Sequence, residues 1–175
     1  MRCCMRLDVS KALVAQGEEV PFSLEIQLPD TVLLGEPVAF PDAVSLQGAC
    51  ISVGEVISLR GELRFTASSR CVLCLMQAEK SFAVPFEVIY ALTPDPENPD
   101  LYVYDGAWID PADAVADAAL LALPMQWRCA ETCKGLCPVC GVDRNMTSCS
   151  CRMEMQQKHP FSALQQLLNE DESEV

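Results

Sequence analysis

The sequence contains a single histidine, His159, among its 175 residues. Histidine is the side chain that most often acts as a general base, or activates a nucleophile, near neutral pH. A Ser-His-Asp or Cys-His arrangement would depend on this one residue, which directly precedes Pro160 and is more simply interpreted as the residue before a helix. The acidic side chains form no catalytic motif. We therefore predict that the protein is not an enzyme.

Long apolar segments and glycine-rich phosphate loops are also missing. The most apolar stretch, residues 114–127, is interrupted by Asp117 and Pro124 and is shorter than the roughly 18 residues of a membrane-spanning helix. Near the N-terminus, Asp8 and Lys11 interrupt any apolar run of the kind found in secretory signals. We therefore expect a cytoplasmic protein with no membrane partner and no small-molecule substrate.

Basic residues are scarce, with 12 Lys and Arg against 25 Asp and Glu, which gives a net charge of −13. The excess lies mainly in residues 1–126, which carry −11, whereas residues 127–159 carry +2 and residues 160–175 carry −4. Phosphate backbones are bound mainly by Lys and Arg. Long-range attraction by this acidic body instead favours a basic partner such as a ribosomal protein, although solubility alone would also explain the charge.

Half of the residues are apolar, which excludes a disordered chain and allows one compact domain with a small appendage. Apolar and polar residues alternate in segments 20–28, 57–65 and 84–92, which predicts half-buried strands. Between residues 44 and 53 the alternation changes phase near Gly48, which predicts a further strand with a bulge. Successive strands with short connections favour an antiparallel sheet, either open or curled towards a barrel.

The expected fold class is α+β. Asp110 and Pro111 form a helix-start signal, and small or apolar residues then recur at helical spacing, so we predict a helix at 111–123 that covers one face of the sheet. The predicted organisation is an acidic β-rich body over residues 1–126 and a cysteine-rich, zinc-binding module over 127–159. Residues 160–175 are expected to form a short C-terminal helix and an acidic tail.

Cysteine is abundant, with 11 residues. In a reducing compartment, clustered cysteines bind metal more often than they form disulfides. The segment Cys137-Pro-Val-Cys140-Gly141 has the form of a zinc knuckle, and a second close pair follows eight residues later. We predict a tetrahedral zinc site with no open position, which would fix the fold without catalysing a reaction. Its four ligands would be Cys137, Cys140, Cys149 and Cys151.

A second quartet is less specific, because its two pairs are distant in sequence and differ in spacing. It consists of Cys71, Cys74, Cys129 and Cys133. The sequence leaves three interpretations open: a second zinc site, thiols without a ligand role, or a redox pair formed by Cys71 and Cys74. We therefore expect one zinc ion, or two if this quartet also binds. The remaining cysteines, Cys3, Cys4 and Cys50, fit small buried side chains or a chain terminus.

Several of these motifs together resemble the YceD family of bacterial and plastid proteins. They are Cys71-Val-Leu-Cys74, Ile109-Asp110-Pro111, the string from Lys134 to Gly141, and Pro160-Phe-Ser-Ala-Leu164. The resemblance extends over residues from about 5 to 168. It implies a non-enzymatic, bacterial ribosome-biogenesis factor that supports accumulation of large-subunit (23S) ribosomal RNA. Combined with the acidic body, it favours a basic ribosomal protein or a precursor of the large subunit as the partner.

Two other function classes remain open. A zinc-ribbon module that binds nucleic acid would use the basic residues of the cysteine-rich segment, which are Arg128, Lys134, Arg144, Arg152 and Lys158. A metal-thiolate redox protein is the other class, because the string from Cys137 to Gly141 also resembles the iron-binding knuckle of rubredoxin. Direct RNA binding is the weaker of the partner predictions, because two zinc-bound Cys4 sites would each add a net charge of about −2.

Overall fold

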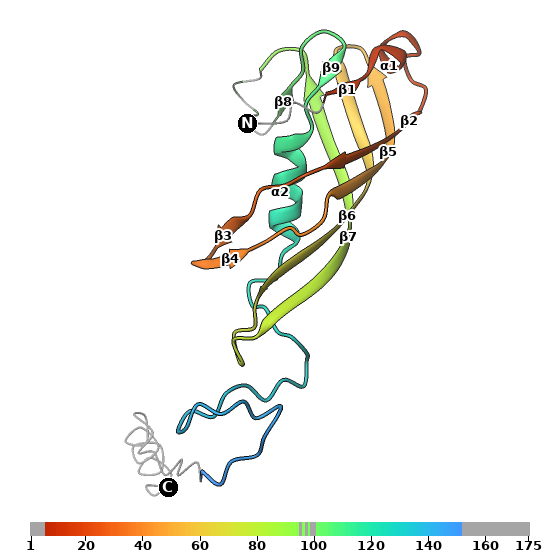
Figure 1. The fold of residues 1–175 in the computed structure, drawn as a ribbon. Coiled ribbons are helices and arrows are strands. Elements are labelled where there is room, and N and C mark those ends of the chain that lie inside the picture. The colour runs from red at the N-terminus through yellow and green to blue at the C-terminus, as the bar shows by residue number, and fades with distance from the viewer. Residues whose placement is uncertain (1–5, 95, 97, 99–100, 152–175) are drawn as a thin grey trace, which may run out of the picture. The chain divides into compact units, whose positions relative to one another are not determined.

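The computed structural model describes residues 6–94, 96, 98 and 101–151. The chain divides into two compact units, Met1–Cys133 and Lys134–Val175. Unit 1 contains every helix and strand of the described residues (Figure 1). In chain order these are β1 (Leu7–Asp8), α1 (Ser10–Val14), β2 (Val20–Ile26), β3 (Thr31–Leu33), β4 (Glu36–Val38), β5 (Val44–Val53), β6 (Val56–Arg70), β7 (Gln77–Ala91), β8 (Tyr102–Val103), β9 (Trp108–Ile109) and α2 (Ala112–Ala122).

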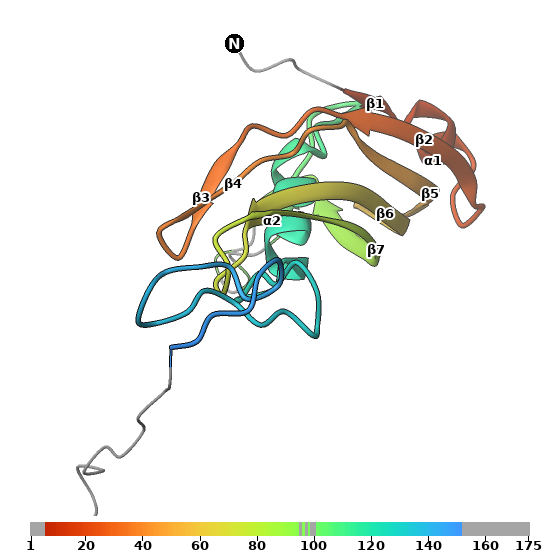
Figure 2. The same cartoon turned by 60° about the horizontal axis from the view of Figure 1, so that its bottom comes forward.

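The main sheet of unit 1 has five strands in the order β2-β5-β6-β7-β8. The four long strands pair in antiparallel fashion, as predicted. The two-residue strand β8, which the sequence did not predict, pairs with β7 in parallel at the edge. Within the described residues, β2 and β8 remain as edges, so the sheet is not closed into a barrel. It curves over α2 instead (Figure 2).

The core lies between the inner face of this sheet and α2. Alternate residues of β5 and β6, among them Leu46, Leu59 and Leu63, are fully buried, and Val115 and Ala119 of α2 pack in the same cluster. The helix begins where the sequence predicts, because the Asp110 carboxylate accepts the backbone N–H of Ala112 (3.1 Å). The helix predicted at 111–123 is thus confirmed as α2.

The bulge predicted near Gly48 was wrong. Pairing between β5 and β6 is unbroken from Ser45 opposite Arg64 to Val53 opposite Val56. The inward positions keep their parity past Gly48 and are taken by Cys50 and Ser52, both buried. The apolar residues that suggested a change of phase point out of the core instead, and the last of them, Val53, is largely exposed.

Two glycines on facing strands allow the sheet to curve. Gly48 on β5 pairs with Gly61 on β6. A Cβ atom at Gly48 would lie 2.0 Å from the carbonyl oxygen of Arg60, and one at Gly61 would lie 2.1 Å from that of Gln47. Any other residue would force the two backbones apart.

We therefore expect Gly61→Ala to lower the free energy of unfolding by about 3 kcal/mol, the upper end for overpacked interiors. The control is Gly54→Ala at the β5–β6 turn, where φ is +63° but a Cβ would meet nothing within 4 Å. Backbone strain alone should cost about 1 kcal/mol there. Urea unfolding of both variants measures the difference, and equal losses would contradict the close approach.

The remaining elements are short. β1 pairs with β9, and β3 pairs with β4 in a hairpin next to the C-terminal half of β6. The sequence did not predict α1, whose five residues are too few for a helical pattern. No helix of the described part of the chain is long and apolar enough to cross a membrane. The predicted C-terminal helix and acidic tail, His159, Cys3 and Cys4 lie outside the described residues.

Candidate metal centres

Eight cysteines form two groups of four. Within each group the sulfur atoms all lie within 4.8 Å of one another. One group is in unit 1 and the other in unit 2, and the members of each come from two segments of the chain. They are Cys71, Cys74, Cys129 and Cys133, and Cys137, Cys140, Cys149 and Cys151. The second group is the quartet predicted to bind zinc, and the first is the quartet for which the sequence left three interpretations open. The structure brings the members of each together.

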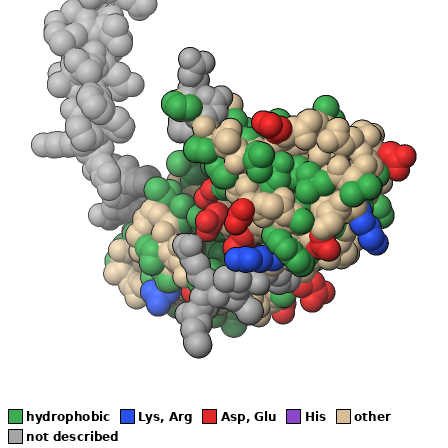
Figure 3. All heavy atoms as spheres, turned by 90° about the horizontal axis from the view of Figure 1, so that it is seen from above, with side chains coloured by type: hydrophobic (Ala, Val, Ile, Leu, Met, Phe, Trp, Pro, Cys, Tyr) green, Lys and Arg blue, Asp and Glu red, His purple; other side chains and the backbone are tan. Residues whose placement is uncertain are grey.

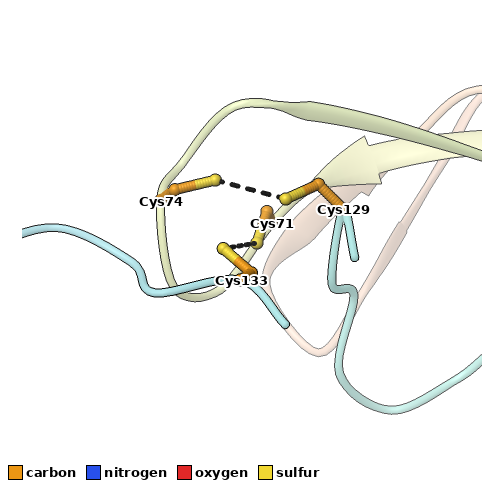
Figure 4. A group of neighbouring side chains, drawn as sticks. All are labelled: Cys71, Cys74, Cys129 and Cys133. Atoms are coloured by element: carbon orange, nitrogen blue, oxygen red, sulfur yellow. Dashed lines mark hydrogen bonds between the residues drawn. The ribbon is translucent and has the colours of Figure 1, made fainter. Parts of the chain in front are cut away.

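The group in unit 1 is positioned by the turn between β6 and β7. The Cys71 N–H donates to the Met76 carbonyl (2.8 Å), and the Leu75 N–H donates to the Cys71 carbonyl (2.9 Å). Leu75 adopts a positive φ of 62° in this tight turn. The backbone of the loop thus turns back on itself and directs Cys71 and Cys74 towards the second segment (Figure 4).

The second segment is held by Trp127, which follows α2. Its carbonyl accepts the Val72 N–H of the β6–β7 turn (2.9 Å), and its buried ring packs edge-on against Phe82 of β7. The core therefore fixes the chain just before Cys129. Trp127 was not among the site residues predicted from the sequence. Its position two residues before a cysteine, as one of only two tryptophans, was the available signal.

The spacing of the sulfur atoms in unit 1 fits a tetrahedral metal. Cys71 Sγ lies 3.9 Å from Cys133 Sγ, and Cys74 Sγ lies 3.6 Å from Cys129 Sγ (Figure 4). Four sulfur ligands at about 2.3 Å from a zinc ion are separated by about 3.8 Å. A disulfide requires about 2.05 Å, and all four cysteines are free. The two segments thus offer a four-sulfur donor set of the size that zinc or iron takes.

The electrostatics of this group favour one thiolate before any metal binds. Burial raises the pKa of Cys71, but the backbone N–H groups of Cys129, Cys74 and Leu73 outweigh it and bring that pKa to about 6. The neighbouring Cys133 thiol raises the pKa of Cys129 to about 12. At neutral pH, Cys71 is therefore a thiolate that attracts a cation, whereas Cys129 gives up its proton only when a metal replaces it.

The group in unit 2 is built on a compact knuckle. The Gly141 N–H donates to the Cys137 carbonyl (2.8 Å), and the Cys137 N–H donates to the Val142 carbonyl (2.8 Å). Gly141 has a φ of 72°, which favours glycine. Backbone N–H groups of Cys140 and Val139 lower the pKa of Cys137 to about 6. Each group therefore has one cysteine with a lowered pKa, and in both groups that cysteine lies in a turn with the same two backbone hydrogen bonds.

Polar side chains close the loop between the two cysteine pairs of unit 2. The Asp143 carboxylate accepts the N–H of Asn145 (2.9 Å), and the Asn145 side-chain oxygen accepts the N–H of Lys134 (2.8 Å). The Cys140 thiol raises the pKa of Cys151 to about 12. Asp143 was not predicted as part of the site, although aspartate and asparagine so close together are typical of turns.

A comparison with protein families shows the family to which the chain belongs. The family model described as "Large ribosomal RNA subunit accumulation protein YceD" matches residues 59–168, which is more than half of the chain. The chain belongs to the YceD family. The matched range begins within β6 and includes β7, α2 and all eight clustered cysteines. The family description links the chain to accumulation of the large ribosomal RNA. No curated protein and no solved structure matches it.

In this YceD family member, replacing both Cys71 and Cys74 with serine should lower the bound metal by one ion per chain. The expected content falls from two to one, because the group in unit 2 is unchanged. The control is Cys50→Ala, since Cys50 is buried in the core and belongs to neither group. Elemental analysis after anaerobic purification measures the count. An unchanged count would show that these thiols are not ligands, and reversible thiol loss under mild oxidant would support the redox interpretation.

Proposed function

We propose that this YceD family member is a non-enzymatic factor in biogenesis of the large ribosomal subunit, acting in the bacterial cytoplasm. It supports accumulation of 23S ribosomal RNA by binding a basic ribosomal protein, free or in a precursor particle. The family match carries the process, since the family description names accumulation of the large ribosomal RNA. The charge of −11 over residues 1–126 supports the mechanism, because it attracts basic chains and repels phosphate.

Each cysteine group fits one structural zinc ion in this proposal. Four sulfur ligands leave no open position for a substrate, so the metals would stabilise the protein and take no part in a reaction. In unit 1, zinc would join the β6–β7 turn to the segment that follows Trp127. In unit 2, it would join the knuckle at Cys137 to the pair at Cys149 and Cys151. Purified protein should be colourless, since iron-thiolate sites absorb visible light and zinc sites do not.

The experiment that tests the proposal is a pull-down of the tagged full chain from growing cells, with and without RNase. We expect a basic large-subunit protein to remain bound after RNase treatment. Raising the salt concentration should weaken that contact, because attraction between exposed charges is screened. The comparison is binding to purified 23S RNA at matched salt, which should be weaker.

The contrary result has a defined form. RNase would remove every ribosomal contact, and purified RNA would bind below about 1 μM at physiological salt with a steep salt dependence. The chain would then act as a nucleic-acid-binding zinc module. Exposed Lys134 and Arg144 of unit 2 would be the first residues to replace with alanine in that case.

A further inference from the structure

The outer face of the main sheet, which points away from α2, differs in chemistry from one end to the other. Away from the β5–β6 turn, most outward positions of β5, β6 and β7 carry polar side chains such as Gln47, Glu62, Arg64 and Ser81, with Ala49, Ala83 and Pro85 between them. At the end that holds the β5–β6 turn, the outward positions are apolar except for Ser58. This group, here named the apolar end, consists of Ile51, Val53, Val56, Ile89, Ala91 and Val103.

The strand register makes these residues one continuous surface. Val53 lies opposite Val56, Val56 lies opposite Ala91, and Ala91 lies opposite Val103 of β8. Ile51 and Ile89 form the next row, on either side of Ser58. Four of the side chains are open to solvent, with exposed fractions from 41% at Val56 to 67% at Val53, and Ile51 and Ala91 are partly buried.

Among the described residues of unit 1, neither helix covers the apolar end. Buried Ala12 of α1 packs with the inner face near Cys50, and α2 also lies against the inner face. Single exposed valines are common in soluble proteins, but a contiguous apolar patch usually marks a contact with another molecule. The same strands carry polar outward residues a few positions away, so the apolar end is confined to one place.

The charges around the apolar end indicate what it would bind. Glu55 lies in the β5–β6 turn. Glu18 and Glu19 lie next to the last residues of β5, because the preceding Gly17 N–H donates to the Ser52 carbonyl (2.8 Å) and the following Val20 pairs with Cys50. Arg60 in the adjoining row is paired with Glu87 (2.9 Å). Seen from above, this end of unit 1 shows many hydrophobic side chains, with acidic side chains and some Lys or Arg side chains among them (Figure 3).

We propose that the apolar end is the docking surface for a basic protein segment, whose apolar side chains pack on the valines and isoleucines and whose Lys or Arg residues meet the acidic border. This rests on the proposed function and adds where the partner binds. A second copy of the chain fits less well, since it would bring two acidic borders together. RNA fits less well too, because its phosphates would meet the same glutamates.

The test compares two double variants with matched strands and matched charge. Val53→Lys with Ile89→Lys places two positive charges in the apolar end, one on β5 and one on β7. Gln47→Lys with Ser81→Lys places two on the polar part of the same face, on the same strands. All four positions are exposed, so both variants should fold, which circular dichroism and metal content check. A third variant, Val53→Ser with Ile89→Ser, removes apolar area without adding charge.

The readout is affinity for the basic large-subunit protein that the wild-type chain captures after RNase. We expect a loss of at least about tenfold for the lysine pair in the apolar end, and a loss for the serine pair. The lysine pair on the polar part should stay within about threefold of wild type.

If the two lysine pairs lower the affinity equally, the partner does not dock on the apolar end, and the proposed function is unaffected. If the wild type captures no basic protein, the proposed function is wrong and the docking inference falls with it. If the wild type forms a dimer that the Val53 and Ile89 changes dissociate, the apolar end binds a second copy of the chain and not a basic protein. If RNA binds at this surface, RNA is its ligand.

Discussion

Replacing Cys140 with serine should unfold residues 134–151 and leave the sheet of unit 1 folded. The described residues of unit 2 contain no helix or strand and bury little apolar surface beyond Cys137. A segment of this kind depends on its metal for a defined structure, because ligand binding supplies the free energy that a hydrophobic core supplies elsewhere. Unit 1 has its own core between the sheet and α2.

Two-dimensional NMR of the labelled variant measures this directly. Amide signals of residues 134–151 should collapse to the range of an unfolded chain, whereas those of β5, β6 and β7 keep their positions. Bound metal should fall by one ion per chain. Ser148→Ala, at an exposed position beside Cys149, is the matched control and should change neither. Loss of the sheet signals in Cys140→Ser would mean that unit 2 is integral to the core of unit 1.

The local cysteine pattern was enough to predict the unit 2 group, since both of its pairs have close spacing within 15 residues. The unit 1 group required a further step, because Cys71 and Cys129 are far apart in sequence. Cys71 and Cys74 lie between the strands predicted at 57–65 and 84–92, and the structure shows the turn between β6 and β7 there. What the sequence could not supply was the role of Trp127, whose backbone carbonyl holds the second segment. The position of the tryptophan close to a cysteine was a signal for its buried ring, but the backbone hydrogen bond itself leaves no pattern in a sequence.

The alternation of apolar and polar residues predicted where the strands lie. It did not always predict how long a strand is or which face of the sheet a residue occupies. β6 and β7 extend beyond the predicted segments into residues 66–70 and 77–83, where small and polar residues hide the pattern and pairing between the two strands maintains the structure. The false bulge at Gly48 has the opposite cause. Ile51 and Val53 were assumed to face the core because they are apolar, and the structure places them on the outer face.

The outward position of Ile51 and Val53 is consistent with a binding role in the proposed mechanism. Apolar residues that break the expected pattern are retained for binding more often than for folding when they gather on one surface. At the apolar end, Ile51 and Val53 lie on the face opposite to the one expected from their apolar character. It is therefore where a partner is expected on physical grounds independent of the charge.

Depleting the protein from cells should lower 23S RNA relative to 16S RNA, because precursor RNA that lacks a ribosomal protein stays exposed to nucleases. The acidic body would hold the basic protein until it reaches the RNA, so the RNA would be protected indirectly. The measurement is the 23S to 16S ratio during depletion. Wild-type protein and the Gln47→Lys, Ser81→Lys variant should both restore the ratio, whereas Val53→Lys, Ile89→Lys should not.

An equal fall of both RNAs would indicate a general effect on growth and contradict a role specific to the large subunit. Restoration by all three proteins would leave the subunit role in place and remove the apolar end from the mechanism.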